Sequence, residues 1–158
     1  MPELIKSSKV KTITRVNDFM IKFANVNGSG SASANKLFAK SVFRMGIPVS
    51  PNNIFPSNIQ GLPTWYEVRI SDAGYLGRRE GIDFMVAMNE QTVNKDIASV
   101  VPGGYVLYDS SKALSADLIR DDVQYLGIPL KDICLREFDN PAQRQLFKNI
   151  VYVGALSA

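Results

Sequence analysis

The chain has 158 residues, of which 46% are hydrophobic and 21% charged, so it is long enough to bury one substantial core as a single domain. It has no apolar run near the roughly 20 residues that cross a bilayer and no signal-peptide centre, which predicts a cytoplasmic protein without a membrane contact. With no histidine and one cysteine, Cys134, the sequence excludes a zinc or iron–sulfur ligand set, an internal disulfide and histidine-dependent catalysis, and we expect no metal site and no catalytic residue in this chain.

Residues 1–17 are predicted to form a basic arm ahead of the folded domain, which we expect to span residues 18–158. The arm carries Lys6, Lys9, Lys11 and Arg15. No aromatic side chain is interleaved with these cations, as a platform for single-stranded nucleic acid would need, and the other basic residues are scattered. We therefore expect a solvated arm and no nucleic-acid partner.

Residues 19–45 predict a strand, a turn and a helix. The stretch FMIKFANV (residues 19–26) is short, apolar and rich in β-favouring types, and the glycine cluster NGSGSASAN follows it at once. The next apolar residues recur at helical spacing and end at Gly46, a common residue after a helix C-terminus. The expected core face holds Leu37, Phe38, Ser41, Val42 and Met45, and the expected solvent face holds Lys36, Lys40 and Arg44.

Two further strands are predicted after this helix. Residues 47–53 form the expected second strand, which closes a β–α–β unit. Residues 64–71 alternate between apolar and polar side chains, which is typical of a strand with one face on the core. Tyr66, Val68 and Ile70 are expected to face the core, and Trp65, Glu67 and Arg69 to face solvent or another chain.

The rest of the chain repeats the strand and helix pattern. Residues 81–89 and 103–111 are apolar runs without alternation, typical of strands buried on both faces, and residues 90–101 predict a helix with Asn89 as its N-cap. Residues 123–130 are a weaker strand candidate. A last helix begins with Asn140 as N-cap and Pro141, and its predicted apolar face holds Phe147, Ile150, Val151, Gly154 and Ala155.

This alternation predicts an α/β fold: a three-layer α/β/α, Rossmann-like domain around a mixed, mostly parallel sheet. Ligands of such sheets bind beyond the carboxyl ends of the strands. Three stretches meet that condition, residues 27–33, 88–92 and 108–111. Together they mark the predicted ligand crevice.

The glycine cluster has two interpretations, a phosphate-binding loop and a plain tight turn. Gly28 and Gly30 allow backbone angles closed to other residues, and the unpaired amides at the start of the following helix favour a phosphate. The P-loop pattern fails around Lys36, and the dinucleotide-binding pattern fails because Ser33 stands in place of its third glycine. The candidate ligand contacts are Asn27, Gly28, Ser29, Gly30, Ser31 and Ser33, of which the last is also a candidate helix N-cap.

A second loop, FPSNIQGLPTWY (residues 55–66), is crowded with residues of strong conformational preference. Its short polar side chains can bind the loop's own backbone or a partner, so a preformed contact surface and a rigid crossover between strands both remain open. Tryptophan and arginine are enriched at protein interfaces. The residues selected for a partner or substrate contact are Ser57, Asn58, Gln60, Gly61, Trp65 and Arg69.

These segments together resemble the gamma domain of 2-oxoacid:acceptor (ferredoxin) oxidoreductases. The resemblance covers residues 18–158 and is carried by ANVNGSGSASANKLF, FPSNIQGLPTWY, DFMVAMNEQT, PGGYVLYDSS and KNIVYVGAL. It is closest to the type fused at the N-terminus of the alpha subunit, as in 2-oxoglutarate oxidoreductases. The family usually carries Gly-x-Gly-Gly-x-Gly in the first loop and Arg-Gly-Gly in the second, whereas this chain has GSGSAS and QGL there.

The resemblance implies a part in an enzyme that converts a 2-oxoacid such as 2-oxoglutarate to acyl-coenzyme A. In that family thiamine diphosphate with Mg²⁺ carries the decarboxylation and iron–sulfur clusters pass electrons to ferredoxin, all in partner alpha and beta domains. The gamma domain contributes to assembly and to a shared coenzyme A site, where residues 28–33 are the expected phosphate contact. We therefore expect a chain that catalyses nothing alone and is truncated at its C-terminus.

Two interpretations from other classes stay open. A stand-alone nucleotide- or coenzyme-A-binding module would keep the glycine loop and need no large exposed apolar surface. A purely structural assembly domain would keep such a surface and leave the glycine loop empty. The surface of the folded domain therefore separates these interpretations.

Overall fold

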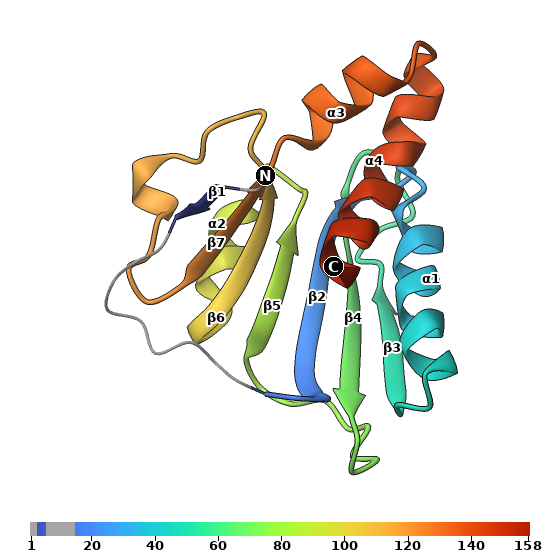
Figure 1. The fold of residues 1–158 in the computed structure, drawn as a ribbon, viewed down its shortest axis with the longest axis vertical. Coiled ribbons are helices and arrows are strands. Elements are labelled where there is room, and N and C mark those ends of the chain that lie inside the picture. Colours follow the sequence, from blue (N-terminus) through green and yellow to red (C-terminus); the bar gives the residue numbers. More distant parts are fainter. Residues whose placement is uncertain (1–2, 6–14) are drawn as a thin grey trace.

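The computed structural model describes residues 3–5 and 15–158, which form one sheet with helices on both faces (Figure 1). The strands are β1 (Glu3–Ile5), β2 (Asp18–Val26), β3 (Val49–Ile54), β4 (Pro63–Ser71), β5 (Ile82–Ala87), β6 (Val100–Asp109) and β7 (Gln124–Ile128). The helices are α1 (Ser31–Arg44), α2 (Val93–Ala98), α3 (Leu130–Glu137), α4 (Pro141–Ser157) and a short 3₁₀ helix, η1 (Ala116–Leu118). This arrangement confirms the predicted three-layer α/β/α fold.

The seven-stranded sheet is mixed and mostly parallel, as predicted, with the order β1-β7-β6-β5-β2-β4-β3. β2, β5, β6 and β7 pair in parallel, whereas β4 pairs antiparallel with both β2 and β3. β4 is therefore inserted into the predicted β–α–β unit, so that β3 runs parallel to β2 one strand away. The direction in which successive strands are added reverses between β2 and β5, and ligands of α/β sheets bind at such a switch point.

The N-terminal segment contributes to the sheet within the described residues. β1 pairs antiparallel with β7, so the prediction of a separate solvated arm is wrong for residues 3–5, whose backbone completes the edge of the sheet. Arg15 Nη1 lies 3.1 Å from Asp83 Oδ1, which ties the chain ahead of β2 to the start of β5. The remaining cations of the predicted arm, Lys6, Lys9 and Lys11, lie outside the described residues.

The larger core lies between the sheet and the helices α1 and α4, which cover the same face (Figure 1). The Phe23 side chain is fully buried at its centre, with ring centroids 5.7 Å from Phe38, 6.4 Å from Tyr66 and 6.1 Å from Tyr152. Each such aromatic pair adds about 0.5–1.5 kcal/mol beyond the apolar area that it buries. These contacts hold α1 and α4 on β2 and β4, and they fix the position of the loop that precedes α1.

The opposite face of the sheet packs against α2. Met20, Met85 and Val106 of the sheet are buried together with Ile97 of α2. Tyr125 Oη donates to Leu118 O at 2.7 Å, which attaches η1 to the same face. α2, which follows β5, and η1, which follows β6, are therefore both held on this face of the sheet.

The face of α1 that meets the sheet differs in part from the predicted one. Phe38 is buried and Val42 half-buried, as predicted, but Leu37 and Met45 are 49% and 73% exposed and Ser41 is also exposed. The prediction counted large apolar side chains, whereas small side chains decide how closely a helix approaches a sheet. The buried positions of α1 are Ser31, Ala34, Asn35, Phe38 and Ala39. The predicted solvent face is confirmed, because Lys36, Lys40 and Arg44 are all exposed.

The second face of β4 is covered, so the prediction that it meets solvent or another chain is wrong. Glu67 is 2% exposed and lies 3.3 Å from Lys22 Nζ and 3.0 Å from Arg78 Nη2. Arg69 is 7% exposed and pairs with Asp18. Charged side chains are buried in proteins when they are paired, and these polar positions therefore belong to the interior.

Trp65 is half-buried and joins β4 to α2. Its Nε1 donates to Asp96 Oδ1 at 2.9 Å, and Lys22 Nζ lies 5.6 Å from the indole centroid. Burial raises the pKa of the Asp96 carboxyl above its usual value, although hydrogen bonds from Thr92 and Trp65 act in the opposite direction. The indole therefore serves a contact between the sheet and a helix of the same chain.

The connection between β5 and β6 holds a shorter helix than predicted. α2 has six residues and its N-cap is Thr92, so the prediction of Asn89 as N-cap is wrong. The buried Asn89 instead donates from Nδ2 to Asn25 O and accepts at Oδ1 from Gln91 N, both at 2.9 Å. β6 begins at Val100, so the end of the predicted helix belongs to the strand.

The helix α3 has no counterpart in the sequence-based prediction. It follows β7 after a single intervening residue, Pro129, and forms a hairpin with α4 (Figure 1). Phe138 and Phe147 close this hairpin with stacked rings whose centroids are 4.2 Å apart. None of the described helices combines the length and the apolar composition of a membrane span.

The last helix begins where it was predicted. Asn140 Oδ1 accepts from Ala142 N at 2.9 Å, and Pro141 is the first helical residue, which confirms the N-cap. Within the predicted apolar face Ile150 and Gly154 are exposed, so these two positions do not pack on the core of this chain. The buried positions of α4 are Asn149, Tyr152 and Val153, and Val151 and Ala155 are half-buried beside the core.

Candidate functional site

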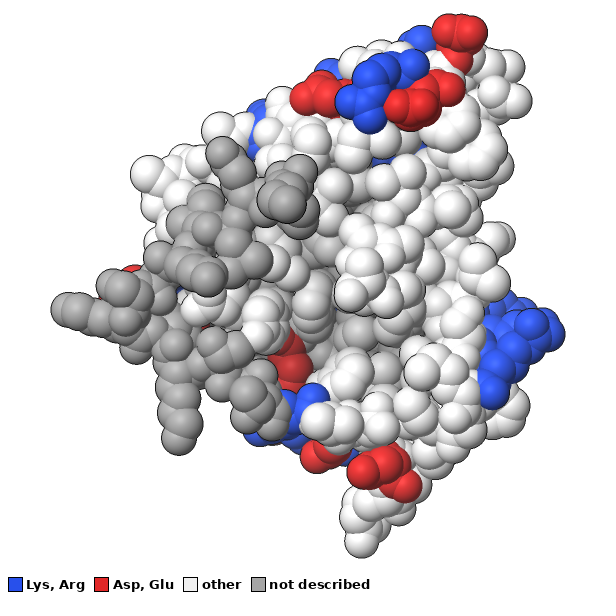
Figure 2. All heavy atoms as spheres, in the orientation of Figure 1, with Lys and Arg blue, Asp and Glu red and all other residues white. Residues whose placement is uncertain are grey.

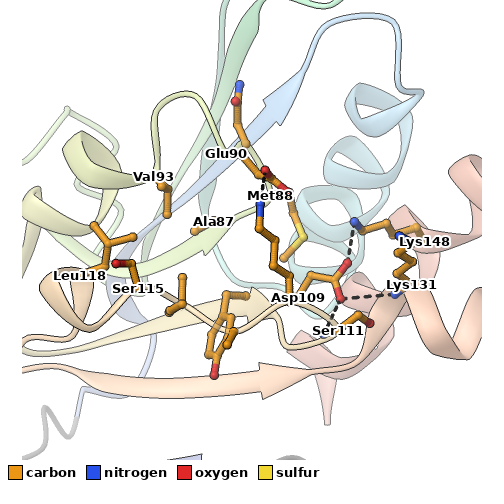
Figure 3. A pocket seen from close by; sticks show the side chains of 15 residues that line it. Ala87, Met88, Glu90, Val93, Asp109, Ser111, Ser115, Leu118, Lys131 and Lys148 are labelled. Carbon is orange, nitrogen blue, oxygen red and sulfur yellow. Dashed lines mark hydrogen bonds and ion pairs between the residues drawn. The ribbon is translucent and has the colours of Figure 1, made fainter.

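A cavity of about 360 Å³ opens at the carboxyl ends of β5 and β6, inside the predicted crevice (Figure 3). Small-molecule sites usually occupy roughly 300–1,000 Å³. Its lining includes residues 88–90, directly after β5, and residues 108–109 and 111–112 at the end of β6. Two of the three stretches predicted to form the crevice therefore come together around one space.

The cavity has an apolar end and a basic end. Figure 3 shows Val93 and Leu118 on one side and Lys131 and Lys148 on the other. Lys112 also belongs to the lining. Apolar side chains accept a flat or aliphatic group, whereas ammonium groups bind phosphate or carboxylate oxygens. The arrangement suits a ligand that is apolar at one end and anionic at the other.

Asp109 organises the basic end. Its Oδ2 lies 2.7 Å from Lys148 Nζ, and its Oδ1 accepts from the amides of Ser111 at 3.2 Å and Lys131 at 3.3 Å. Ser111 Oγ accepts from Asp132 N at 3.1 Å, so the end of β6 caps the first turn of α3. Burial raises the pKa of the Asp109 carboxyl, but Lys148 and the hydrogen bonds outweigh it and hold the pKa below its usual value. The carboxylate therefore fixes Lys148 at neutral pH.

The other two lysines of the cavity differ in their partners. Lys112 Nζ lies 2.7 Å from Glu90 Oε2, whereas Lys131 has no ion pair within residues 3–5 and 15–158. Three lysines and two carboxylates line the cavity, so the lining carries a net charge of +1. A concave site with positive charge attracts anions.

The glycine loop between β2 and α1 lies at the same edge of the sheet. Gly28 and Gly30 have φ angles of 83° and 77°, which confirms the predicted left-handed backbone. The Asn27 amide donates to Leu62 O at 2.8 Å, and Asn27 O accepts from Gly61 N at 3.0 Å. The two loops that the sequence analysis selected separately are therefore joined by backbone hydrogen bonds.

The helix α4 contacts the glycine loop from the other side. Asn149 Nδ2 donates to Ser29 O at 2.8 Å, and the preceding residue, Lys148, lines the cavity, so loop and cavity are neighbours. Ser29 Oγ is buried and has no hydrogen-bond partner in the described part of the chain. The amides of Gly30 and Ser31 likewise donate to no described acceptor. Such donors at a helix start are available to an anion.

A buried polar network below the loop was not found from the sequence pattern. Tyr152 Oη donates to Asn35 Oδ1 at 2.7 Å, and Asn35 Nδ2 donates to Asn25 Oδ1 at 3.0 Å. Burial raises the pKa of the Tyr152 hydroxyl, so it remains a neutral donor. This network holds α4 and α1 in register beneath the glycine loop, because buried polar groups keep their hydrogen-bond partners.

The remaining predicted contacts of the glycine cluster and of β4 have mixed outcomes. Ser31 is buried as the first residue of α1. Ser33 is exposed within the first turn, so its predicted N-cap role is wrong, because Gly30 occupies that position. Trp65 and Arg69 lie in the sheet contacts described above, away from the cavity lining.

Some polar side chains of the second loop make contacts within the chain itself. Ser57 Oγ accepts a hydrogen bond from Ile59 N at 3.2 Å. Gln60 lies over Gly28, where an added Cβ would be 2.7 Å from Gln60 Cγ. Asn58 and Gly61 are exposed. Ser57 and Gln60 therefore order the two loops, and the exposed positions remain available to another molecule.

The lysines of the cavity were not predicted from the sequence. Lys131 stands just beyond the carboxyl end of β7, the strand next to β6, so the rule that selected the other stretches would also have selected it. Lys112 follows the selected residues 108–111 directly. Lys148 had no such signal, because its position depends on how α4 is rotated over the sheet.

Gly28→Ala is expected to lower the free energy of unfolding more than Gly46→Ala. Both glycines have a positive φ, 83° and 85°, so both variants carry the same backbone strain. At Gly46 an added Cβ meets nothing within 4 Å, whereas at Gly28 it meets Gln60. We expect a loss of about 1–2 kcal/mol at Gly46 and about 1 kcal/mol more at Gly28, measured by urea unfolding.

The double variant Gly28→Ala/Gln60→Ala tests the cause of that difference. Shortening Gln60 removes the atom that the new methyl group meets, so the additional loss should disappear. An additional loss that persists without the Gln60 side chain would contradict the packing of the second loop on the glycine loop.

Residues 20–158 match the family described as "Pyruvate ferredoxin/flavodoxin oxidoreductase". The chain belongs to this family. The match runs from within β2 to the last residue and includes the glycine loop, the second loop and every residue that lines the cavity. The family resemblance found in the sequence is therefore confirmed.

Two relatives of this chain are much longer proteins. The 2-oxoacid:ferredoxin oxidoreductase 2, subunit alpha, of Aeropyrum pernix is 25% identical over 135 residues, which are 85% of this chain and 20% of that protein. The 2-oxoglutarate:ferredoxin oxidoreductase of Magnetococcus marinus, solved with 2-oxoglutarate, coenzyme A and succinyl-CoA bound, has a TM-score of 0.78 and 26% identity over 90% of this chain and 24% of that chain. This chain thus spans a fifth to a quarter of these relatives.

Subunits of more similar length share the fold. The pyruvate oxidoreductase subunit PORC of Thermotoga maritima has a TM-score of 0.68 and 20% identity, over 89% of this chain and 75% of that one. The gamma subunit of a keto/oxoacid ferredoxin oxidoreductase from Geobacter sulfurreducens has a TM-score of 0.66 and 23% identity, over 87% and 75%. The same architecture therefore occurs in a separate subunit and within a long chain.

Proposed function

We propose that this domain is the gamma component of a 2-oxoacid:ferredoxin oxidoreductase and contributes the coenzyme A side of its active site. The complete enzyme would oxidise a 2-oxoacid to acyl-coenzyme A and pass the electrons to ferredoxin. 2-Oxoglutarate is the first substrate to test, because it is bound in the Magnetococcus marinus relative together with coenzyme A. The observation that carries the proposal is the cavity with one apolar and one basic end.

The nucleotide part of coenzyme A matches the two ends of the cavity. Its adenine is flat and can lie against Val93 and Leu118, while its phosphates can reach Lys112, Lys131 and Lys148. A cavity of about 360 Å³ holds only part of so large a molecule, and the remainder must lie elsewhere.

The glycine loop offers a second place for a phosphate. The amides of Gly30 and Ser31 and the buried Ser29 hydroxyl have no acceptor in the described part of the chain. Lys148 and Asn149 are consecutive in α4, so the cavity and the loop can serve one extended ligand. We therefore keep Asn27, Gly28, Ser29, Gly30, Ser31 and Ser33 as candidate contacts of coenzyme A.

The surface around the glycine loop supports a role in assembly. Ile59 is 64% exposed and Phe55 49% exposed in the second loop, and Leu146 and Ile150 of α4 are 48% and 41% exposed. In Figure 2 charged residues gather over α3, whereas the area over α4 is uncharged. Exposed apolar patches mark contacts with other proteins, and a stand-alone module has no need of one. We assign this surface to the alpha and beta domains.

The remaining chemistry of the enzyme is assigned to those partner domains. One cysteine and no histidine cannot hold an iron–sulfur cluster. Among the described residues no three side chains of His, Cys, Asp or Glu gather in a metal-binding arrangement. We therefore place thiamine diphosphate, Mg²⁺ and the iron–sulfur clusters outside this chain, which contributes binding and assembly.

Titration of the purified domain with coenzyme A tests this function. We expect weak binding, in about the millimolar range, because a complete site draws on other domains. The NMR signals of the amides of residues 88–90, 109–112 and 28–31 should shift together. Pantetheine, which lacks the adenine and the phosphates, should leave these signals in place. Shifts confined to other parts of the domain, or equal shifts with pantetheine, would contradict the proposal.

A further inference from the structure

The ion pair between Glu90 and Lys112 bridges the two walls of the cavity. Glu90 stands in the turn after β5 and Lys112 in the loop after β6, and Glu90 Oε2 lies 2.7 Å from Lys112 Nζ (Figure 3). Both residues line the cavity. Their side chains are 77% and 73% exposed, so the pair lies at the rim where water screens it.

The second ion pair of the cavity is held in a different way. The side chains of Asp109 and Lys148 are 18% and 28% exposed. Asp109 also accepts hydrogen bonds from the amides of Ser111 and Lys131, so its loss would release the first turn of α3. The Asp109 carboxylate is thus fixed by several contacts within the fold, whereas the Glu90 carboxylate is held by one ion pair that water screens.

We propose that Glu90 is a displaceable counter-ion of this cavity: a ligand phosphate takes its place on Lys112, while Asp109 stays on Lys148. The ligand class rests on the proposed function, and the displacement itself applies to any compact polyphosphate. A terminal phosphate or a pyrophosphate carries more negative charge than the carboxylate that it replaces, and it gains Lys131, which has no ion pair in the described chain. Glu90 therefore lowers the affinity of the cavity for anions and favours those with high charge.

Binding of inorganic pyrophosphate at fixed ionic strength tests the displacement. The variant Glu90→Gln should bind pyrophosphate about three- to tenfold more tightly than the natural chain, because Lys112 no longer has a resident partner. The matched control is Glu137→Gln. It removes the same charge from an exposed ion pair outside the cavity, in which Glu137 Oε1 lies 2.7 Å from Arg136 Nε. This control should change the affinity less than twofold.

A double-mutant cycle with Lys112→Gln separates displacement from general repulsion. If Glu90 acts through Lys112, the gain from Glu90→Gln should fall by at least half when Lys112 is absent. An unchanged affinity in Glu90→Gln, an equal gain in Glu137→Gln, the same gain without Lys112, or no pyrophosphate binding by any form would each overturn the proposal. Tighter pyrophosphate binding by Glu90→Gln together with no binding of coenzyme A would support the displacement and overturn the proposed function.

Discussion

Replacing Asp83 with alanine is expected to lower the free energy of unfolding by about 3–5 kcal/mol. Asp83 is 4% exposed at the start of β5, where its Oδ2 accepts from Met20 N at 2.8 Å. Its carboxylate also pairs with Arg15 at 3.1 Å and with Arg79. Alanine leaves a buried amide and a partly buried guanidinium without their acceptor. The loss is therefore larger than that of an exposed ion pair.

Two further variants show whether the charge or the hydrogen bond matters more. Asp83→Asn keeps an oxygen for the Met20 amide and removes the charge, so it should lose about half as much as alanine. Glu137→Gln breaks an exposed pair and should change the free energy of unfolding by less than about 0.5 kcal/mol. Urea unfolding of all three measures the differences. A loss in Asp83→Ala as small as that of Glu137→Gln would show that the buried network does not stabilise the sheet.

The helices and strands that have local sequence signals could be predicted from the sequence. β2, β5 and β6 are apolar runs bounded by turn residues, and each was predicted within a few residues of its observed bounds. Asn140 and Pro141 form a helix start within two residues, so the beginning of α4 could be read directly. α3 was not predicted because its eight residues include four charged ones and only Pro129 separates them from β7.

The packing of those elements could be predicted only in part, because a pattern says which residues share a face and not what covers it. Glu67 and Arg69 alternate with core residues as a solvent face does, and yet both are buried. Their ion-pair partners include Lys22, far away along the sequence, and the segment after β4, which contributes Arg78. Such long-range pairing has no signal in a local pattern.

The site was predicted in its location and only partly in its chemistry. The rule that ligands lie at the carboxyl ends of parallel strands selected residues 88–92 and 108–111, and the cavity is there. The positive charge of the cavity was not predicted: the same rule could have selected Lys131, which follows β7, whereas Lys148 comes from α4 and had no such signal. A helix that packs across a sheet edge brings its side chains into a site by tertiary contacts, which a single sequence does not reveal.

Reversing the charge of Lys131 is expected to impair the assembled oxidoreductase strongly and selectively. Lys131 is exposed, has no ion pair in the described chain and lines the basic end of the cavity, so Lys131→Glu should fold normally. Combined with its alpha and beta partners, this variant should raise the KM for coenzyme A about 100-fold. Losing one charge-assisted phosphate contact and adding a repulsion accounts for an effect of that size. The KM for the 2-oxoacid should stay within about twofold.

The control for this experiment is Lys40→Glu, which reverses the charge of an exposed lysine on the outer face of α1, away from the cavity. It should leave both KM values unchanged, because in the proposed function only a charge inside the cavity would contact the phosphates. The chain without its partners should reduce no acceptor and acylate no coenzyme A in either form. Equal losses in Lys131→Glu and Lys40→Glu would point to a general electrostatic effect on assembly. Turnover by the isolated chain would show instead that the chemistry assigned to the partner domains belongs to this one.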